Sequence, residues 1–368
     1  MSESAAESSP YGDLAEVGWT PERADEFAPY AAVHRPARVA RIEKGGALLI
    51  TAQGELRATF GGDILAEAAQ ERSRFPVPGD WVALRDWSDD RTTIEAVLPR
   101  HTSIVRDGAD RTSHGQVLAA NVDLVVVVEH LDPEPAVGRV ERLLVLAWGS
   151  GATPVVVMTK ADLVPDPDGM RAEIEAVAPG VEVIVTSLPA GDGLDALRAQ
   201  LAPGRTMVFV GPSGAGKSTL VNALAGAEVM ETGTVRAIDG KGRHTTTHRE
   251  LIVLPGRGVV LDTPGLRSVG LVANPDAVTS AFPEIDALAQ DCRFRDCGHE
   301  TEPGCAVLAA VDDGELDERR LESWRKLQRE AAFHARRADA RLKAQAAAIW
   351  KQRQKHLRLH YKNNPGKR

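Results

Sequence analysis

Residues 211–218 read Gly-Pro-Ser-Gly-Ala-Gly-Lys-Ser and match the pattern G-x-x-x-x-G-K-[ST] at every fixed position. A short apolar segment, 206–210, precedes them, and residues 219–224 have the pattern of a helix. In this setting of strand, loop and helix, glycines let backbone N–H groups converge on the phosphate oxygens of a nucleotide. The motif therefore predicts an α/β domain with a phosphate-binding loop. The residues expected to bind the phosphates are Gly211, Pro212, Ser213, Gly214, Ala215, Gly216, Lys217, Ser218 and Thr219.

Two side chains of this loop and a motif downstream predict a magnesium site. Lys217 can reach the β- and γ-phosphates, and the hydroxyl of Ser218 can ligate Mg²⁺. Asp262 opens the motif Asp-Thr-Pro-Gly and follows the apolar segment 258–261, so it is expected at the carboxyl end of a buried strand. There its carboxylate can hold Mg²⁺, usually through water, while the N–H of Gly265 faces the γ-phosphate.

A basic, threonine-rich segment, residues 240–249, lies between these motifs. One threonine of such a segment completes the Mg²⁺ coordination when a γ-phosphate is present, and Thr246 is the expected ligand. Composition alone would favour the alternative, a basic surface loop. Leu266 follows Gly265, at the position where a glutamine orients the attacking water in Ras-like proteins. Intrinsic hydrolysis is therefore expected to be slow, and His244 is the candidate catalytic residue, with a phosphate-facing or RNA-facing donor as its alternative role.

Residues 159–162, Thr-Lys-Ala-Asp, predict the choice of base. They follow the apolar segment 154–158, and a carboxylate at Asp162 can accept hydrogen bonds from the N1–H and N2–H₂ edge of guanine, which adenine does not offer. Asparagine is usual where this chain has Thr159, and threonine lacks the amide that ties the base loop to the phosphate loop. This loss is expected to weaken nucleotide binding, with the base choice unchanged.

A second base-contacting loop is expected after the apolar segment 181–185, at Thr186 and Ser187. Serine and threonine after a strand are also common turn formers, so this loop is the weaker of the two predictions. The full set expected at the base is Thr159, Lys160, Ala161, Asp162, Thr186 and Ser187.

The order of these motifs is unusual. The base-reading motif precedes the phosphate loop in the chain, whereas a GTPase normally has it afterwards. This order predicts a circularly permuted GTPase. It also means that the segment after Asp262 leaves the nucleotide domain within a few residues. A contact between Gly265 and the γ-phosphate could therefore bias the placement of the C-terminal part of the chain.

All three cysteines of the chain fall in one short stretch with a histidine: Cys292, Cys297, His299 and Cys305. Three thiolates and one imidazole make a closed tetrahedral site for one structural Zn²⁺, because four protein ligands leave no open position. An odd cysteine count argues against disulfides. Reduced core cysteines are the alternative.

Residues 36–100 show short alternating segments punctuated by glycine, at 38–42, 47–51, 55–59 and 80–84. They predict a small five-stranded β-barrel that binds RNA, and periodicity alone allows an OB-type or an SH3-like barrel equally. Aromatic residues are few, which favours recognition of RNA backbone or shape over base stacking. Ahead of the barrel, residues 1–34 are acidic and are expected to be a flexible lead-in.

The end of the chain is strongly basic. Residues 319–368 hold sixteen Lys and Arg against three acidic residues, a formal charge of +13, whereas the whole chain carries −8. The pattern is helical, with no glycine or proline before Pro365, and the last residues, 362–368, are expected to be disordered. A basic helix of this kind suits an RNA backbone, and a solvated helical tail is the alternative.

Composition narrows the classes further. A chain of 368 residues with 43% hydrophobic residues can bury the cores of two or three domains. It has no apolar run of about 18 residues and no signal-peptide pattern, so a cytoplasmic protein without a membrane partner is expected.

The motif order, the segment Gly-Arg-His-Thr-Thr at 242–246 and the Cys/His cluster together resemble the RsgA/YjeQ family of small ribosomal subunit biogenesis GTPases, from about residue 35 to the low 300s. The resemblance implies a GTPase that is stimulated by the small ribosomal subunit, binds its rRNA and acts late in its maturation. The resemblance also favours the OB-type barrel over the SH3-like one.

The expected architecture is multidomain, and the chain is expected to act as a monomer. Its parts are a lead-in (1–34), an OB-fold RNA-binding barrel (35–100), a permuted α/β GTPase domain (101–275), and an α-rich zinc-binding domain with a basic helix (276–368). Two other classes fit the motifs less well: a P-loop metallochaperone or kinase-like NTPase, and a non-hydrolysing RNA-binding scaffold.

Overall fold

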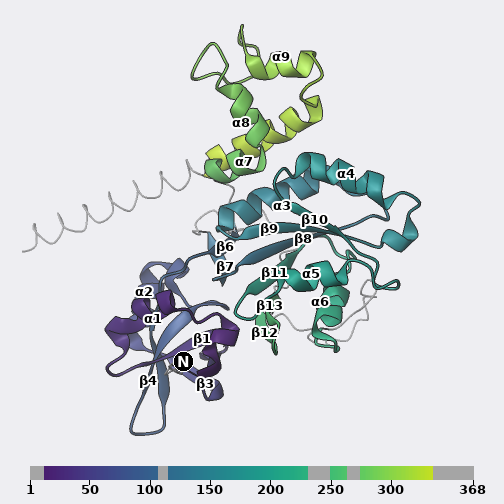
Figure 1. Ribbon diagram of the computed structural model, residues 1–368. Helices are drawn as coiled ribbons and strands as arrows, with labels where there is room; N and C mark the ends of the chain where they lie inside the picture. The colour runs from purple at the N-terminus through teal and green to yellow at the C-terminus, as the bar shows by residue number, and fades with distance from the viewer. Residues whose placement is uncertain (1–11, 107–114, 231–248, 263–273, 335–368) are drawn as a thin grey trace, which may run out of the picture.

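The computed structural model describes residues 12–106, 115–230, 249–262 and 274–334 (Figure 1). Three parts follow one another along the chain: a closed β-barrel, an α/β domain and a helical C-terminal region. The expected multidomain fold is confirmed. No helix within these ranges is long and apolar enough to cross a membrane.

Five strands form the barrel: β1 (Arg35–Glu43), β2 (Gly46–Thr51), β3 (Gly54–Phe60), β4 (Trp81–Asp86) and β5 (Thr92–Val97). Their hydrogen-bonded order is β1-β2-β3-β5-β4, and β4 pairs again with β1, which closes the barrel. Helix α2 (Gly62–Gln70) lies between β3 and β4 in the chain. This is the expected OB-type arrangement. Alternate residues point inward, and Val39, Leu49, Leu84 and Ile94 are fully buried.

The acidic lead-in is folded where the structure describes it, so the expectation of a flexible segment over 1–34 is wrong for residues 12–34. The segment forms η1 (Gly12–Val17), α1 (Pro21–Phe27) and η2 (Ala28–Tyr30). Trp19 packs edge-on against Trp81 of the barrel with ring centroids 4.8 Å apart. Apolar side chains spaced among the acidic ones keep the segment packed against the barrel. Residues 1–11 lie outside the described ranges.

The α/β domain contains β8 (Leu124–His130), β9 (Thr153–Thr159), β10 (Glu182–Val185), β11 (Thr206–Val210), β12 (Glu250–Leu254) and β13 (Gly258–Asp262). Their order is β10-β9-β8-β11-β13-β12, with all neighbours parallel except β12 and β13. Strand β11, which leads into the phosphate loop, lies in the centre, although β8, β9 and β10 precede it in the chain. The permuted connectivity thus builds an ordinary nucleotide-binding sheet.

Helices cover both faces of this sheet (Figure 1). Helices α3 (Val137–Ser150) and α4 (Pro167–Val177) lie on one face, and α5 (Leu194–Gln200) and α6 (Lys217–Ala225) on the other. A hairpin of β6 (Ser103–Arg106) and β7 (Gln116–Ala120) packs Ile104 and Leu118 into the core on the α3 face. The barrel adds to the edge of the sheet through one residue pair between β1 and β12, Arg41 and Glu250, whose side chains form an ion pair at 2.7 Å.

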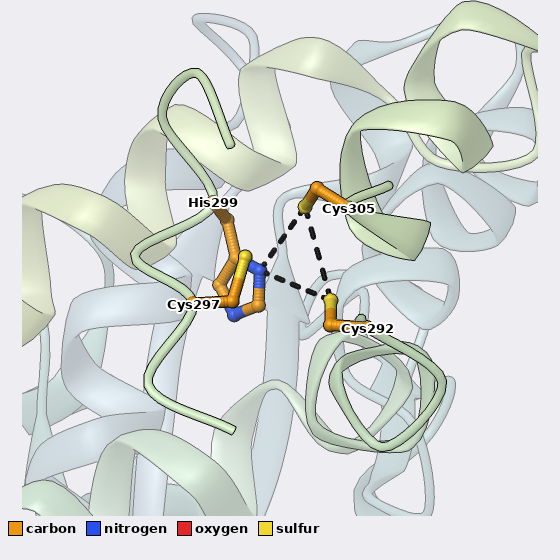
Figure 2. A group of neighbouring side chains, drawn as sticks. All are labelled: Cys292, Cys297, His299 and Cys305. Carbon is orange, nitrogen blue, oxygen red and sulfur yellow. Dashed lines mark hydrogen bonds between the residues drawn. The ribbon is translucent and has the colours of Figure 1, made fainter. Parts of the chain in front are cut away.

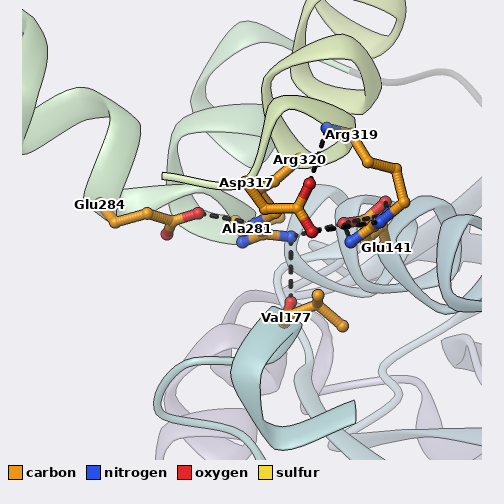
Figure 3. Close-up of polar contacts among 7 residues, drawn as sticks. All are labelled: Glu141, Val177, Ala281, Glu284, Asp317, Arg319 and Arg320. Atoms are coloured by element: carbon orange, nitrogen blue, oxygen red, sulfur yellow. Dashed lines mark hydrogen bonds and ion pairs between the residues drawn. The ribbon is translucent and has the colours of Figure 1, made fainter. Parts of the chain in front are cut away.

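The C-terminal region contains α7 (Pro275–Ala281), α8 (Pro283–Ala289), α9 (Ala306–Asp312) and a further helix over residues 318–334. Figure 3 shows the polar cluster that fastens it to the α/β domain. Arg320 is 3% exposed, and its guanidinium binds Glu141 of α3 at 3.0 Å, Glu284 of α8 at 2.6 Å and the carbonyl oxygen of Val177 at 3.1 Å. Arg319 adds a second ion pair to Glu141 at 3.2 Å. One buried carboxylate therefore anchors two arginines of the last described helix.

Candidate nucleotide site and metal cluster

The loop between β11 and α6 has the shape that phosphate binding requires. Gly211 has φ of 143°, and a Cβ there would come 2.1 Å from the carbonyl oxygen of Val128 on β8, so only glycine fits. Gly214 and Gly216 also have positive φ. The ammonium of Lys217 donates hydrogen bonds to the carbonyl oxygens of Gly211 at 2.9 Å and Pro212 at 2.5 Å, which holds it over the loop.

Thr159, at the end of β9, contacts this loop directly. Its hydroxyl donates a hydrogen bond to the carbonyl oxygen of Ala215 at 2.9 Å and lies 3.3 Å from the carbonyl oxygen of Glu129. The residue is buried. The expected loss of the connection between the two loops is therefore wrong, because the threonine hydroxyl makes the connection for which the asparagine amide is normally used.

The two expected base loops lie against each other. The N–H of Ala161 donates to the carbonyl oxygen of Thr186 at 3.2 Å, and the hydroxyl of Ser187 donates to Asp162 Oδ1 at 2.9 Å. Asp162 is exposed, whereas Thr186 and Ser187 are buried. Ser187 thus fixes one carboxylate oxygen, and the second oxygen has no hydrogen-bond partner in the part of the chain that the structure describes. Lys160 has φ of 64° and donates from Nζ to the carbonyl oxygen of Asp132 at 3.1 Å.

One supporting pair was missed from the sequence. Glu129 is fully buried at the end of β8, and Arg139 of α3 binds both of its carboxylate oxygens, at 2.6 and 2.8 Å. The backbone carbonyl of Glu129 faces Thr159. The pair fixes the end of β8 beside the base loop. An acidic residue that ends a run of apolar ones was the only signal in the sequence.

The expected magnesium ligands are described in part. Asp262 ends β13, next to β11, and Ser218 lies in the first turn of α6, so both belong to the carboxyl edge of the parallel strands. Ligands bind at this edge in open α/β sheets. His244, Thr246 and Gly265 lie outside the described residues.

The four expected zinc ligands meet in one cluster in the C-terminal region (Figure 2). Cys292 Sγ lies 3.8 Å from Cys305 Sγ and 3.6 Å from His299 Nδ1, and His299 Nδ1 lies 3.3 Å from Cys305 Sγ. All four ligand atoms, including Cys297 Sγ, are within 4.8 Å of one another. Around a tetrahedral zinc ion, with bonds of about 2.3 Å to sulfur and about 2.0 Å to nitrogen, ligand atoms lie roughly 3.5–3.8 Å apart. The cluster fits a metal ion of this size.

Neighbouring groups hold this cluster in shape. Glu302 accepts hydrogen bonds from the backbone N–H groups of Glu300 at 2.8 Å, Thr301 at 3.0 Å and Gly298 at 2.9 Å. Its carboxylate therefore binds the backbone on both sides of His299. These bonds lower the pKa of Glu302 to about 2. Burial, with the nearby cysteine sulfurs, raises the pKa of Cys297 to about 11, although the backbone N–H of His299 acts the other way. A bound cation would instead lower the pKa of Cys297, because a cysteine binds a metal ion as the thiolate.

Comparison with known proteins agrees with this geometry. Residues 97–272 match the model of the RsgA GTPase family. A protein of Streptomyces coelicolor named small ribosomal subunit biogenesis GTPase RsgA is 48% identical over 354 residues, which are 95% of each chain.

The chain belongs to the RsgA family of GTPases.

Other RsgA proteins are similar over most of their length. A relative of the same name from Opitutus terrae is 45% identical over 92% of this chain and 95% of its own. The crystal structure of YjeQ from Thermotoga maritima matches with a TM-score of 0.61 and 27% identity, over 82% of this chain and 99% of that one. The structure of YloQ, described as a circularly permuted GTPase, matches with a TM-score of 0.58 and 26% identity, over 82% and 96%. Membership of the RsgA family makes the protein a GTPase.

Proposed function

We propose that this GTPase acts late in the assembly of the small ribosomal subunit in the cytoplasm, that it binds the rRNA of that subunit, and that the subunit stimulates its hydrolysis of GTP. The relatives carry the name small ribosomal subunit biogenesis GTPase. Those names support the ribosomal part of the proposal, and the observation that supports the nucleotide part is the contact of the base loop with the phosphate loop through Thr159 and Ala215.

In the proposed complex, residues 211–219 bind the phosphates and residues 159–162 with 186–187 bind the base. The free oxygen of Asp162 accepts from the guanine edge, because Ser187 fixes the other oxygen and turns the carboxylate. The close contact between the two loops at Ala215 sets the distance from base to phosphate. A guanine nucleotide is favoured because adenine has no donor pair to offer Asp162.

Mg²⁺ would be held by Ser218, Asp262 and Thr246, where it would neutralise charge that develops on the transferred phosphate. Ser218 and Asp262 have the oxygen donors that this ion prefers, and both lie at the correct edge of the sheet. His244 is the proposed group that orients the attacking water, since Leu266 cannot.

The cluster of Cys292, Cys297, His299 and Cys305 is proposed to hold one structural Zn²⁺. Thiolate and imidazole ligands in a closed set of four favour zinc over magnesium or calcium, which prefer oxygen. The ion would tie the end of α8 to the start of α9, because Cys292 follows α8 and Cys305 caps α9.

Binding to rRNA is proposed for the barrel and for the basic end of the chain. The described part of the last helix passes beside the Cys/His cluster, where Arg325 donates a hydrogen bond to the carbonyl oxygen of His299. Residues 335–368, which hold most of the positive charge, lie outside the described ranges.

The test measures GTP hydrolysis alone, with small subunits and with large subunits. Slow hydrolysis that rises at least tenfold with small subunits only would support the proposal. Turnover that small subunits leave unchanged would refute stimulation, and binding without any turnover would favour a scaffold. Transfer of phosphate to an acceptor would favour a kinase-like enzyme.

A further inference from the structure

One acidic side chain lies near the end of the otherwise apolar strand β8. Glu129 follows a run of leucine and valine residues and is fully buried at the carboxyl edge of the sheet. The guanidinium of Arg139 binds both of its carboxylate oxygens, at 2.6 and 2.8 Å, whereas His130 Nδ1 lies 3.8 Å from the nearer one. The Arg139 side chain is 37% exposed. The ion pair therefore joins the core strand to the surface of the domain.

Stability alone is a poor explanation of this pair. Removal of a carboxylate from water is costly, and an apolar residue of similar size often serves a core equally well. Arg139 also lies in the first turn of α3, where the helix dipole disfavours a cation and where no acidic residue or side-chain cap compensates for it. A buried ionic group can instead fix one arrangement of the chain. The position in which the pair holds the end of β8 is the better explanation.

The backbone at and after Glu129 holds the base loop in three places. The N–H of Leu131 donates to the carbonyl oxygen of Thr159 at 2.9 Å. The carbonyl oxygen of Glu129 lies 3.3 Å from the hydroxyl of Thr159. Lys160 donates from Nζ to the carbonyl oxygen of Asp132 at 3.1 Å. A shift at the end of β8 would therefore move the base loop with it.

Such a movement would reach the residue that is expected to read the base. Lys160 is the residue before η4 (Ala161–Leu163), and Asp162 is the middle residue of this single turn. Nothing in the phosphate loop could follow the movement freely, because Gly211 already packs tightly against the carbonyl oxygen of Val128 on the same strand. The end of β8 thus sets the place of the Asp162 carboxylate relative to the phosphates.

We propose that Arg139 is a positioning residue for guanine recognition, and that it acts through Glu129 and the end of β8 on the base loop. Arg139 itself does not contact the nucleotide in this arrangement. The proposal deepens the proposed function and rests on it, because it requires Asp162 to accept hydrogen bonds from guanine. Loss of the arginine should therefore reduce the discrimination between bases, which a general loss of stability would leave unchanged.

The experiment compares the binding of GTP with that of inosine triphosphate, which lacks the exocyclic amine of guanine. Both are titrated into the whole protein with Mg²⁺, well below the Tm of each variant. The proteins are the wild type, Arg139→Gln, Arg139→Lys and the control Arg142→Gln. Arg142 lies on the same helix and forms a half-exposed ion pair with Glu330 at 2.7 Å, so the control also removes an arginine from α3.

Arg139→Gln should weaken GTP binding about tenfold and inosine triphosphate binding about threefold, so the preference for GTP falls about threefold. GTP loses more because guanine offers Asp162 two donors and inosine offers one. Arg139→Lys keeps the charge but not the paired geometry of the guanidinium, and should retain part of the preference. Arg142→Gln should bind both nucleotides as the wild type does.

A merely structural arginine would give equal weakening of both nucleotides, or a lower Tm with an unchanged preference, and either result would overturn the proposal. Wild-type affinity for both nucleotides in Arg139→Gln would overturn it as well. If Arg139→Gln does not fold, the preference of Arg139→Lys against that of Arg142→Gln decides.

A parallel titration of Asp162→Asn separates this proposal from the proposed function. Wild-type GTP affinity in Asp162→Asn would refute the base site and the positioning role together. Weak GTP binding in Asp162→Asn, with an unchanged preference in Arg139→Gln, would refute the positioning role alone.

Discussion

The hydroxyl of Thr159 donates a hydrogen bond to the carbonyl oxygen of Ala215, 2.9 Å away, and so joins the base loop to the phosphate loop. The two residues are 56 positions apart in the sequence, and in the permuted chain the donor comes first. A second acceptor, the carbonyl oxygen of Glu129, lies 3.3 Å from the same hydroxyl, and Arg139 holds the Glu129 side chain. Three separate segments thus converge on one side chain.

Removal of this hydroxyl should weaken nucleotide binding. Thr159→Val keeps the shape of the side chain but leaves a buried carbonyl oxygen without its donor, which costs about 1.4 kcal/mol, or about tenfold in GTP affinity. Thr159→Asn can restore a donor and should lose less. Titration with a fluorescent GTP analogue measures both. Equal affinity in Thr159→Val and the wild type would show that the contact does not position the loops.

The proposed zinc at the Cys/His cluster should govern the fold of the C-terminal region. Purified protein should contain about one zinc ion per chain, and Cys297→Ala should lose it together with the structure of residues 283–312, because the free energy of binding structural zinc is free energy of folding. Metal analysis and limited proteolysis measure the two effects. The prediction fails if protein prepared without chelator contains no zinc.

The buried carboxylate of Glu141 should hold the C-terminal region to the GTPase domain. Glu141→Gln removes the buried charge partner of Arg320 and leaves it with the more exposed Glu284, and loss of one member of a buried ion pair costs about 3–5 kcal/mol. The Tm should fall clearly, and protease sites within 274–334 should open first. The matched control is Glu173→Gln, an exposed position on α4, which should change nothing. A Tm equal to that of the control would show that the pair contributes little.

Catalysis should depend on His244. We expect His244→Ala to bind GTP normally and to lose most of the stimulation by small subunits, because His244 is the best candidate for the role of the missing switch glutamine. Leu266→Ala should keep the stimulation largely intact. Intrinsic and subunit-stimulated rates are compared for both variants. Full stimulation without His244 would refute its catalytic role.

Those parts of the molecule that depend on local sequence could be predicted. The phosphate loop, the strand before it and the cluster of three cysteines and one histidine are each contained in a short stretch, so their chemistry is visible in the residues. The barrel was expected from four alternating segments, and β5 was not identified because Thr92–Val97 has no glycine or proline next to it and contains Glu95.

Contacts between distant segments could not be predicted. Arg320 looks like any arginine of a basic helix, yet it is buried between α3, α4, α7 and α8. The donor at Thr159 was underestimated because the sequence shows which group is lost from asparagine but not that a hydroxyl is close enough to replace it. The folded lead-in was missed because its acidic residues outnumber the few apolar ones that pack on the barrel.

The most direct test of the whole account is the base preference of Asp162→Asn. If Asp162 reads guanine, this variant should bind GTP far more weakly, by at least tenfold, and should gain affinity for xanthosine triphosphate, whose edge offers an acceptor where guanine has a donor. The control Asp168→Asn changes a nearby exposed aspartate and should keep the wild-type preference. Competition binding of the two nucleotides gives the result. Unchanged GTP affinity in Asp162→Asn would contradict the assignment of the base site, and with it the account of how this chain selects its substrate.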